Sequence, residues 1–238
     1  MAGLTATSAP PLVRLATVDS TQRHAAALAR DGAPDGSVVM AETQTAGKGR
    51  RGRVWQDTPG AGLLLSLVVR SSLPRERRPT FGLATGIAVV EALTSVGVTA
   101  RLKWPNDVLV SGRKIAGVLL EAQGDAVIAG IGINVLRDAV PGALAGLATS
   151  VAHEGGTADR EALLQALLRA FDHWRARLER EGFAPVRARW SELSETLGRR
   201  VTVDGVSGVA EALDEDGALL LRTGTETVRV ISGDVSAG

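Results

Sequence analysis

The 238-residue sequence contains no cysteine, which excludes disulfides, thiolate chemistry and zinc sites of the ribbon type. A formal net charge of +1 gives no indication of a nucleic-acid or membrane partner. The apolar runs are too short to cross a membrane, and the first residues lack the pattern of a signal peptide. We therefore expect a soluble, cytoplasmic protein. With 45% hydrophobic residues, the chain can bury a core as one large domain, or as one domain with a small partner.

Several familiar catalytic patterns are also absent. The three histidines, His24, His153 and His173, do not have the spacing of metal ligands, and no His-Glu-x-x-His motif occurs. Ser20 does not lie in a Gly-x-Ser-x-Gly sequence, which argues against a nucleophilic serine. No Gly-Lys pair is followed by serine or threonine as in a P-loop. The sequence thus gives no sign of metalloprotease, serine hydrolase or P-loop chemistry.

Lysine and asparagine are scarce, so their positions are informative. Of the 27 basic residues 24 are arginine, and the three lysines are Lys48, Lys103 and Lys114. The chain has two asparagines, Asn106 and Asn134. Because lysine and arginine bind anions with different geometry, an arginine-rich chain has reason to keep lysine where arginine cannot serve. These five residues are therefore candidates for a binding site.

The apolar pattern predicts a folded part at residues 12–194, preceded by a flexible tail at 1–11 that has two prolines and no apolar period. A helix is expected after the cap formed by Asp19, Ser20 and Thr21 and should end at residue 32. Two more helices are expected at 79–96 and 159–181. Strands are expected at 12–19, 38–44, 63–70, 100–103, 108–110, 115–122 and 126–135.

The remaining residues, 195–238, differ in pattern and in charge. Short strands with turn signals are expected at 201–203, 209–213, 218–222 and 227–231, which is typical of a small all-β barrel. Residues 1–190 carry 23 bases and 17 acids, whereas residues 191–238 carry four bases and nine acids. The near-neutral total thus conceals a basic part and an acidic part, with a predicted boundary near residue 195.

The most basic segment is GKGRRGR at 47–53, which has four positive charges, three glycines and no acid. Glycines allow the backbone to approach an anion closely, and the basic side chains neutralise it. A solvated loop and a nucleic-acid patch are alternative interpretations. The position of the segment between two apolar strands in a near-neutral protein favours a site for one small anion.

Three further segments contain the other scarce residues. In KWPND at 103–107, Pro105 fixes a turn that gathers a cation, an amide and a carboxylate, suited to metal or proton chemistry or to a simple Asx turn. RKIAG at 113–117 brings Lys114 to the start of a strand, or to a hairpin with a solvated lysine. GIGIN at 130–134 has two glycines in an apolar strand, which favours close approach of a ligand or another backbone, or a bulge.

With these motifs in this order, the sequence resembles a biotin–protein ligase of the short form that lacks an N-terminal DNA-binding domain. The matching segments are DSTQ at 19–22, QTAGKGRRGRVW at 44–55, KWPND, RKIAG and GIN at 132–134. Two positions depart from the family pattern: some members have arginine in place of Lys48 or asparagine in place of Gln22. The resemblance implies an α+β fold. A class II aminoacyl-tRNA synthetase-like catalytic domain with a mixed sheet flanked by helices would occupy 12–194, and an SH3-like barrel 195–238.

The resemblance implies an ATP- and Mg²⁺-dependent ligase. Biotin would react with ATP to give biotinyl-5′-AMP and pyrophosphate, and a specific lysine of a biotin carboxyl carrier protein, of the acetyl-CoA carboxylase type, would then take the biotinyl group. No DNA and no membrane partner are expected, and the sequence leaves open whether the chain forms a homodimer. A lipoate–protein ligase is the alternative within the same fold, and a nucleic-acid-binding module is the alternative from another class.

The resemblance also implies roles for the candidate residues. Arg50 and Lys114 are expected to clamp the biotin carboxylate and the α-phosphate, because the first step brings two anions together. Asp107 is expected to accept a proton in the second step or to bind Mg²⁺. The loop at 45–62 is expected to close over the intermediate and exclude water. The expected biotin-binding residues are Ser20, Thr21, Gln22, Gln44, Lys48, Gly49, Arg50 and Lys114, and the expected ATP-binding residues are Arg53, Trp55, Lys103, Asn106 and Asn134.

Overall fold

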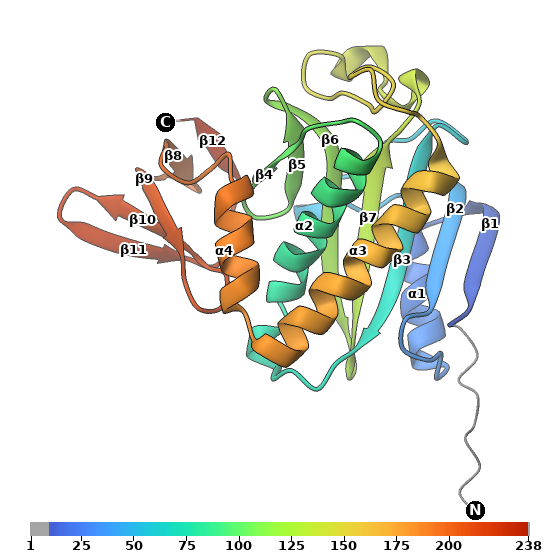
Figure 1. The fold of residues 1–238 in the computed structure, drawn as a ribbon, viewed down its shortest axis with the longest axis horizontal. Coiled ribbons are helices and arrows are strands. Elements are labelled where there is room, and N and C mark those ends of the chain that lie inside the picture. Colours follow the sequence, from blue (N-terminus) through green and yellow to red (C-terminus); the bar gives the residue numbers. More distant parts are fainter. Residues whose placement is uncertain (1–9, 238) are drawn as a thin grey trace, which may run out of the picture.

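The computed structural model describes residues 10–237, so most of the tail predicted at 1–11 lies outside the described residues. The larger part is a seven-stranded mixed sheet with the order β1-β2-β3-β7-β6-β5-β4 (Figure 1). Strands β1 and β2 pair in parallel, and the other neighbours pair antiparallel. The strands are β1 (Leu12–Val18), β2 (Val38–Gln44), β3 (Gly62–Arg70), β4 (Arg101–Lys103), β5 (Asp107–Val110), β6 (Arg113–Gln123) and β7 (Ala126–Asn134).

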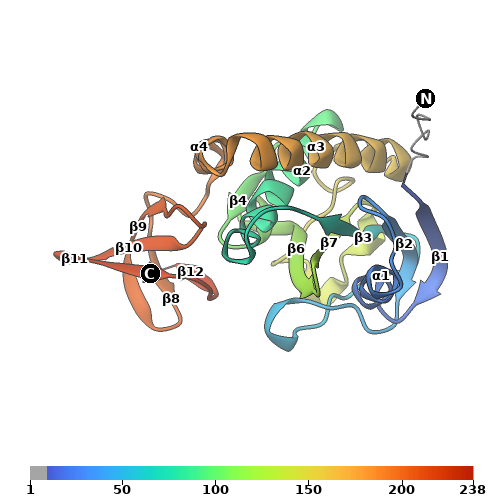
Figure 2. The same cartoon turned by 90° about the horizontal axis from the view of Figure 1, so that it is seen from below.

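Helices cover both faces of this sheet (Figure 2). Helix α1 (Thr21–Arg30) lies on one face, and α2 (Thr80–Ser95) and α3 (Arg160–Glu181) lie on the other. Helix α2 is buried over most of its length because it lies between the sheet and α3. Helix α3 is capped by Asp159, whose carboxylate accepts hydrogen bonds from two backbone N–H groups, and it packs a single apolar stripe against the core. The face that carries α1 is therefore the thinner one.

A smaller antiparallel sheet follows α4 (Ala184–Leu193) and has the order β11-β10-β9-β8-β12. Its strands are β8 (Arg200–Val203), β9 (Val206–Leu213), β10 (Leu219–Thr223), β11 (Glu226–Val230) and β12 (Val235–Ala237). Figure 2 shows this C-terminal sheet beside the β4 end of the large sheet. Within the described residues, no helix combines the length and the apolar character that a membrane crossing requires.

Trp104 joins the two parts. Its indole is 2% exposed, and its Nε1 donates to the carbonyl oxygen of Gly217 in the C-terminal part at 3.0 Å. Its backbone N–H donates to Thr196 Oγ1 at 2.9 Å, and the N–H of Glu195 donates to the Leu102 carbonyl at 2.7 Å. The segment that contains the KWPND motif therefore contacts the C-terminal part directly.

The expected α+β fold with a mixed sheet is confirmed, and the predicted strands and helices are present with ends that differ by at most three residues. Helix α4 and strand β12 were not predicted. Helix α4 has a proline in its first turn and buries only Val186 and Trp190, so its sequence lacks the apolar stripe that identifies α3. Strand β12 has three residues, too few to show an alternating pattern.

Candidate active site

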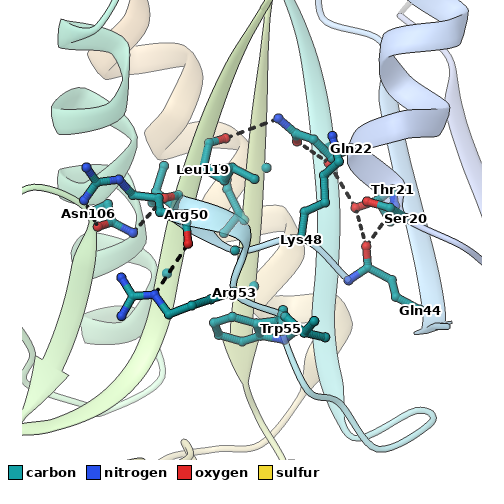
Figure 3. A pocket seen from close by; sticks show the side chains of 18 of the residues that line it. Ser20, Thr21, Gln22, Gln44, Lys48, Arg50, Arg53, Trp55, Asn106 and Leu119 are labelled. Carbon is teal, nitrogen blue, oxygen red and sulfur yellow. Dashed lines mark hydrogen bonds between the residues drawn. The ribbon is translucent and has the colours of Figure 1, made fainter. Parts of the chain in front are cut away.

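A pocket opens on the α1 face of the large sheet. It lies between the start of α1, strands β6 and β7, and the glycine-rich loop that follows β2 (Figure 3). The predicted site residues that line it are Ser20, Thr21, Gln22, Gln44, Lys48, Gly49, Arg50, Arg53, Trp55, Asn106 and Lys114. Of the other predicted residues, Asp107 forms an ion pair with Lys114, Asn134 lines a neighbouring cavity, and Lys103 lines neither cavity.

One end of the pocket is built from neutral side chains. Gln44 Oε1 accepts hydrogen bonds from the backbone N–H and the hydroxyl of Thr21, at 2.8 and 3.1 Å. Ser66 Oγ lies 3.0 Å from both Thr21 Oγ1 and Gln22 Oε1, and Gln22 Nε2 donates to the carbonyl of Ile128 at 3.0 Å. Ser66, Thr21 and Gln22 are all buried, so this network fixes the neutral end before any ligand binds.

Ser20 contributes an unused hydrogen-bonding group to the neutral end. Its Oγ is buried and has no partner within residues 10–237. Although Ser20 occupies the N-cap of α1, as predicted, its side chain makes no capping bond there, and its backbone N–H donates to Asp19 at 2.6 Å. A buried hydroxyl without a partner costs about 1–3 kcal/mol. A ligand that offers a hydrogen bond at this point would recover that free energy.

Glycines on β6 and β7 allow side chains to lie directly on the sheet. Gly117 and Gly132 are paired across the two strands, and a Cβ on Gly132 would lie 2.7 Å from the Trp55 ring. A Cβ on Gly130 would lie 2.4 Å from Gln22 Oε1. A ligand or another backbone was predicted to approach this glycine-containing strand, whereas the groups that approach it in the structure are the side chains of Trp55 and Gln22.

The opposite end of the pocket, around Arg50 and Lys114, is cationic. Of the four cations that line the whole pocket, Lys48, Arg50, Arg53 and Lys114, three have carboxylate partners. Lys48 Nζ donates to both oxygens of Glu121, at 3.0 and 3.1 Å. Lys114 Nζ lies 2.6 Å from Asp107 Oδ1 and 5.5 Å from the centre of the Trp55 ring. The charge of each lysine is thus balanced within the protein.

Arg50 differs from the other three cations, because its hydrogen-bond partners within the described residues are neutral. Its Nη1 donates to Asn106 Oδ1 at 3.1 Å and to the carbonyl oxygen of Gly233 at 3.2 Å. Asn106 is itself bonded to β6, since its Nδ2 donates to the Val118 carbonyl at 3.1 Å. Burial lowers the pKa of Arg50 from its ordinary value, against the opposing effect of nearby acids, but a guanidinium stays protonated at neutral pH. Arg50 therefore retains its charge for an anionic ligand.

Arg51 and Arg53 attach the glycine-rich loop to the C-terminal sheet. Arg51 makes a bidentate ion pair with Asp204, at 2.7 and 2.8 Å, and Arg53 Nη2 lies 2.6 Å from Asp234. The hydrogen bonds from Arg51 lower the pKa of the Asp204 carboxyl below its ordinary value. Arg51 has a φ of 54°, which residues other than glycine rarely adopt, so its ion pair stabilises a strained bend. The basic loop and the acidic part of the chain thus meet here.

A second cavity adjoins the pocket at Val54, Trp55 and Lys114. Its remaining wall is formed by Gln56, by Asn134 at the end of β7 and by apolar residues of the segment 139–148. Asn134 Nδ2 donates to the carbonyl of Thr149 at 2.9 Å, which holds that segment against β7. Because the two cavities meet at the indole and the Lys114 ammonium, they can accommodate two parts of one ligand.

The residues present do not fit a resident metal ion. Over residues 10–237, no group of three or more His, Asp or Glu side chains could hold one. Asp107, expected as either a proton acceptor or a Mg²⁺ ligand, is bound to Lys114. Since Mg²⁺ in nucleotide sites is bound largely by substrate phosphates, it would have to arrive with the nucleotide.

Two polar residues near the pocket were missed by the sequence reasoning. Ser66 lies in β3, where it is the one polar residue in the run GLLLSLVV, and a lone hydroxyl in a buried strand is a signal that could have identified it. Glu121 pairs with Lys48 across 73 residues of sequence, and no local pattern indicates that contact.

Known protein families match both parts of the chain. The model of the biotin/lipoate A/B protein ligase family matches residues 15–138, and that of the biotin protein ligase C-terminal domain matches residues 196–238. The chain is 39% identical over 224 residues to the biotin–[acetyl-CoA-carboxylase] ligase of Paracoccus denitrificans, which covers 87% of this chain and 92% of that protein. It is 36% identical over 234 residues to the bifunctional ligase/repressor BirA of Bacillus spizizenii, covering 93% of this chain and 72% of that protein.

Solved structures of biotin protein ligases are also similar to this chain. The biotin protein ligase from Aquifex aeolicus, in complex with biotin and ATP, matches with a TM-score of 0.83 and 30% sequence identity. The match covers 95% of this chain and 97% of the Aquifex chain. The similarity therefore extends over the large sheet and the C-terminal sheet together.

Proposed function

Because this chain belongs to the biotin/lipoate A/B protein ligase family, we propose that it activates biotin with ATP and transfers it to a carrier protein. In the first step an oxygen of the biotin carboxylate attacks the α-phosphorus of ATP, and pyrophosphate leaves. In the second step the amine of a lysine on a biotin carboxyl carrier domain attacks the acyl carbon of biotinyl-5′-AMP, and AMP leaves. Relatives named as biotin ligases, and a similar structure that contains biotin and ATP, support this activity.

The polarity of the pocket is the observation that carries the proposal. Biotin has a neutral ureido ring at one end and a carboxylate at the other. The neutral end of the pocket, with the unpartnered Ser20 hydroxyl, is suited to the ring, because a neutral donor and acceptor group needs neutral partners. The end with Arg50 is suited to the carboxylate. The pocket therefore orients the carboxylate toward the glycine-rich loop.

Catalysis of the first step is electrostatic. The biotin carboxylate is ionised at neutral pH, so the step requires no general base. Arg50 and Lys114 bring the carboxylate and the α-phosphate together and stabilise the added negative charge of the transition state. Asn106 keeps the Arg50 guanidinium in place, and Asp107 does the same for the Lys114 ammonium.

The biotin-side residues divide into two groups. Ser20 and Gln44 contact the ureido ring, and Lys48 and Gly49 line the path of the acyl chain. Thr21 and Gln22 act mainly through the network that they form with Ser66, since their side-chain groups are already bonded within the protein. Gln22 therefore affects the shape of the pocket through this network.

The adenylate occupies the second cavity in this proposal. Trp55 lies where the two cavities adjoin, and Asn134 lines the second cavity. Both residues are assigned to the nucleotide base. Arg53 lines the pocket and is assigned to the phosphates, although its ion pair with Asp234 gives it a second role in attaching the loop. Lys103 lies on β4 outside both cavities, so its assignment to ATP has the least structural support.

Finer features of the chain are proposed on the same basis. We assign the large sheet to a class II synthetase-like catalytic domain at 12–194 and the C-terminal sheet to an SH3-like domain at 195–238. Mg²⁺ accompanies ATP as its complex. We expect no DNA-binding activity, which a gel-shift assay with promoter DNA would test. Sedimentation of the protein with and without biotin and ATP would test for a homodimer.

Pyrophosphate release tests the proposed function. The protein is mixed with ATP and with either biotin or lipoate, and the rate of pyrophosphate release is measured. We expect release with biotin, followed by labelling of a biotin carboxyl carrier domain on its lysine. Release with lipoate alone would show that the chain acts on the other substrate of its family.

A further inference from the structure

The linker between β7 and α3, residues 135–159, lies at one end of the large sheet (Figure 1). Pairing between β6 and β7 ends at Ala116 and Ile133, and residues 147–152 of the linker form hydrogen bonds with the chain of both strands beyond that point. The apolar residues of the linker at 139–148 form part of the wall of the second cavity. The position of the linker therefore determines the shape of the cavity that we assign to the nucleotide.

Thr149 holds the linker in place with all three of its polar groups. Its N–H donates to the carbonyl oxygen of Lys114 at 2.9 Å, and its own carbonyl oxygen accepts from Asn134 Nδ2 at 2.9 Å. Its hydroxyl donates to Glu154 Oε1. Lys114 and Asn134 both line the second cavity. Thr149, which is 1% exposed, thus connects a cation and an amide of this cavity to one carboxylate.

The Glu154 carboxylate is held by two donors from different parts of the chain. Its side chain is 15% exposed, and the oxygen that accepts from Thr149 also accepts from Arg113 Nη2 at 2.8 Å. Arg113 is the first residue of β6 and directly precedes Lys114. A carboxylate shielded from water needs such partners, because its desolvation is costly. Glu154 therefore connects the linker to β6 through side chains that line neither cavity.

Lys114 has further supports, whereas Asn134 depends on the linker. Lys114 pairs with Leu109 of β5, and its ammonium is bound to Asp107. Within the described residues, the side-chain amide of Asn134 donates to the Thr149 carbonyl alone. None of residues 135–159 lines the first pocket. A shift of the linker would therefore move the Asn134 amide and the apolar wall of the second cavity, and would leave Lys114 and the first pocket in place.

We propose that Glu154 is a positioning residue for the nucleotide and acts through the Thr149 hydroxyl, an inference that rests on the proposed function. The bond between Glu154 and Thr149 fixes the linker where the nucleotide base meets Asn134 while the α-phosphate meets Lys114. Glu154 itself lines neither cavity, so it contacts neither substrate. Loss of this bond weakens the binding of ATP and leaves the cations that activate biotin in place.

Steady-state pyrophosphate release, with ATP and biotin varied separately, tests the proposal. In Glu154→Ala and in Thr149→Val the KM for ATP should rise about tenfold, because a buried hydrogen bond to a charged group is lost. The KM for biotin and kcat should change less than threefold. Thr149→Ser keeps the hydroxyl and should bring the KM for ATP to within twofold of that of the unmodified protein. A merely structural role would raise the KM for both substrates alike.

A double variant shows whether Glu154 acts through Thr149. If the two residues act through one hydrogen bond, Glu154→Ala combined with Thr149→Val should raise the KM for ATP about as much as either change alone. Multiplication of the two effects, to a rise of about a hundredfold, would overturn the proposal. Arg113→Gln removes the second partner of Glu154 at a side chain that is 40% exposed, and it should raise the KM for ATP about threefold.

The control is Glu192→Gln, which removes a carboxylate paired with Arg189 within α4. It should leave both KM values unchanged. An unchanged KM for ATP in Glu154→Ala and Thr149→Val, or equal rises for ATP and biotin, would contradict the positioning role. If both variants fail to fold, an unchanged KM for ATP in Arg113→Gln has the same meaning. Absence of pyrophosphate release from the unmodified protein with biotin would instead contradict the proposed function, so the two failures are distinguishable.

Discussion

The two ends of the pocket are stabilised by different kinds of interaction. At the neutral end, Ser66 and Gln22 are 0% and 3% exposed and bonded to their neighbours. At the cationic end, ion pairs join side chains that are far more exposed, such as Lys114 at 34% and Arg53 at 63%. Buried hydrogen-bond networks are costly to rearrange, whereas exposed ion pairs contribute about 0–1 kcal/mol each. The comparison indicates that the site for the ureido ring is preformed, whereas the cationic end that binds the anions can rearrange at lower cost.

Removal of Lys114 should have the largest effect and should be confined to the cationic end. Lys114→Ala leaves Asp107 facing two substrate anions without a counter-charge, so the rate of pyrophosphate release should fall about 10³-fold. Biotin affinity, measured by calorimetry in the absence of ATP, should fall much less because the neutral end is untouched. A release rate within tenfold of the unmodified protein would remove Lys114 from the mechanism.

A methyl group on Gly130 should damage the neutral end. In Gly130→Ala the new Cβ would lie 2.4 Å from Gln22 Oε1, and Gln22 cannot move without breaking its bonds to Ser66 and Ile128. We expect a loss of about 1–3 kcal/mol in the free energy of unfolding and a matching loss of biotin affinity. Gly146→Ala is the control for stability, because nothing lies within 4 Å of its Cβ position. Equal melting temperatures for both variants would contradict the rigid network.

Ser20→Ala separates recognition from stability. The Ser20 hydroxyl has no partner in the described residues, so its removal should leave the melting temperature unchanged or slightly higher. The KM for biotin should rise about tenfold, because the ring loses one hydrogen bond in a buried site. Steady-state kinetics and thermal unfolding of the same preparation check both parts. An unchanged KM would place the ureido ring elsewhere.

Asp204→Asn should make the glycine-rich loop open more often, with a smaller effect on function than the three changes above. It removes the charge that holds Arg51 in its left-handed conformation, so the loop should open more often and release biotinyl-AMP about threefold faster. Dissociation of the adenylate into a trap of unlabelled ligand measures this rate. Asp216→Asn, which removes one of the two carboxylate partners of Arg229 in the C-terminal part, should leave it unchanged.

Lowering the pH should produce the smallest of these effects, and it should be confined to the glycine-rich loop. Because Arg51 lowers the pKa of Asp204, the stabilising effect of this pair is fully present above the ordinary value of 3.8 and is lost as the pH falls through the lowered pKa. Hydrogen exchange of the loop should therefore increase, relative to that of β3, as the pH falls below 3.8, after correction for the intrinsic rate. Asp204→Asn should show no such change, and an equal increase in β3 would indicate general unfolding.

Local pattern was enough to predict most of the fold and much of the pocket lining. Leu163 and Trp174 belong to a clear helical stripe, and the scarce Lys48 and Lys114 both line the pocket. Contacts between distant residues were not predictable. The basic loop and the acidic C-terminal residues were recognised as opposite in charge, but the pairing of Arg51 with Asp204, 153 residues away, depends on how the two sheets are placed.

The packing of Trp55 on paired glycines has a practical consequence for spectroscopy. The chain has four tryptophans and no tyrosine, so its near-ultraviolet emission comes from indole alone. Trp104, Trp174 and Trp190 are 2%, 4% and 1% exposed, and none of them lines either cavity. Trp55 lines both cavities and lies 5.5 Å from the Lys114 ammonium. A change in fluorescence on adding a ligand to the unlabelled protein would therefore report on the region where the two cavities meet.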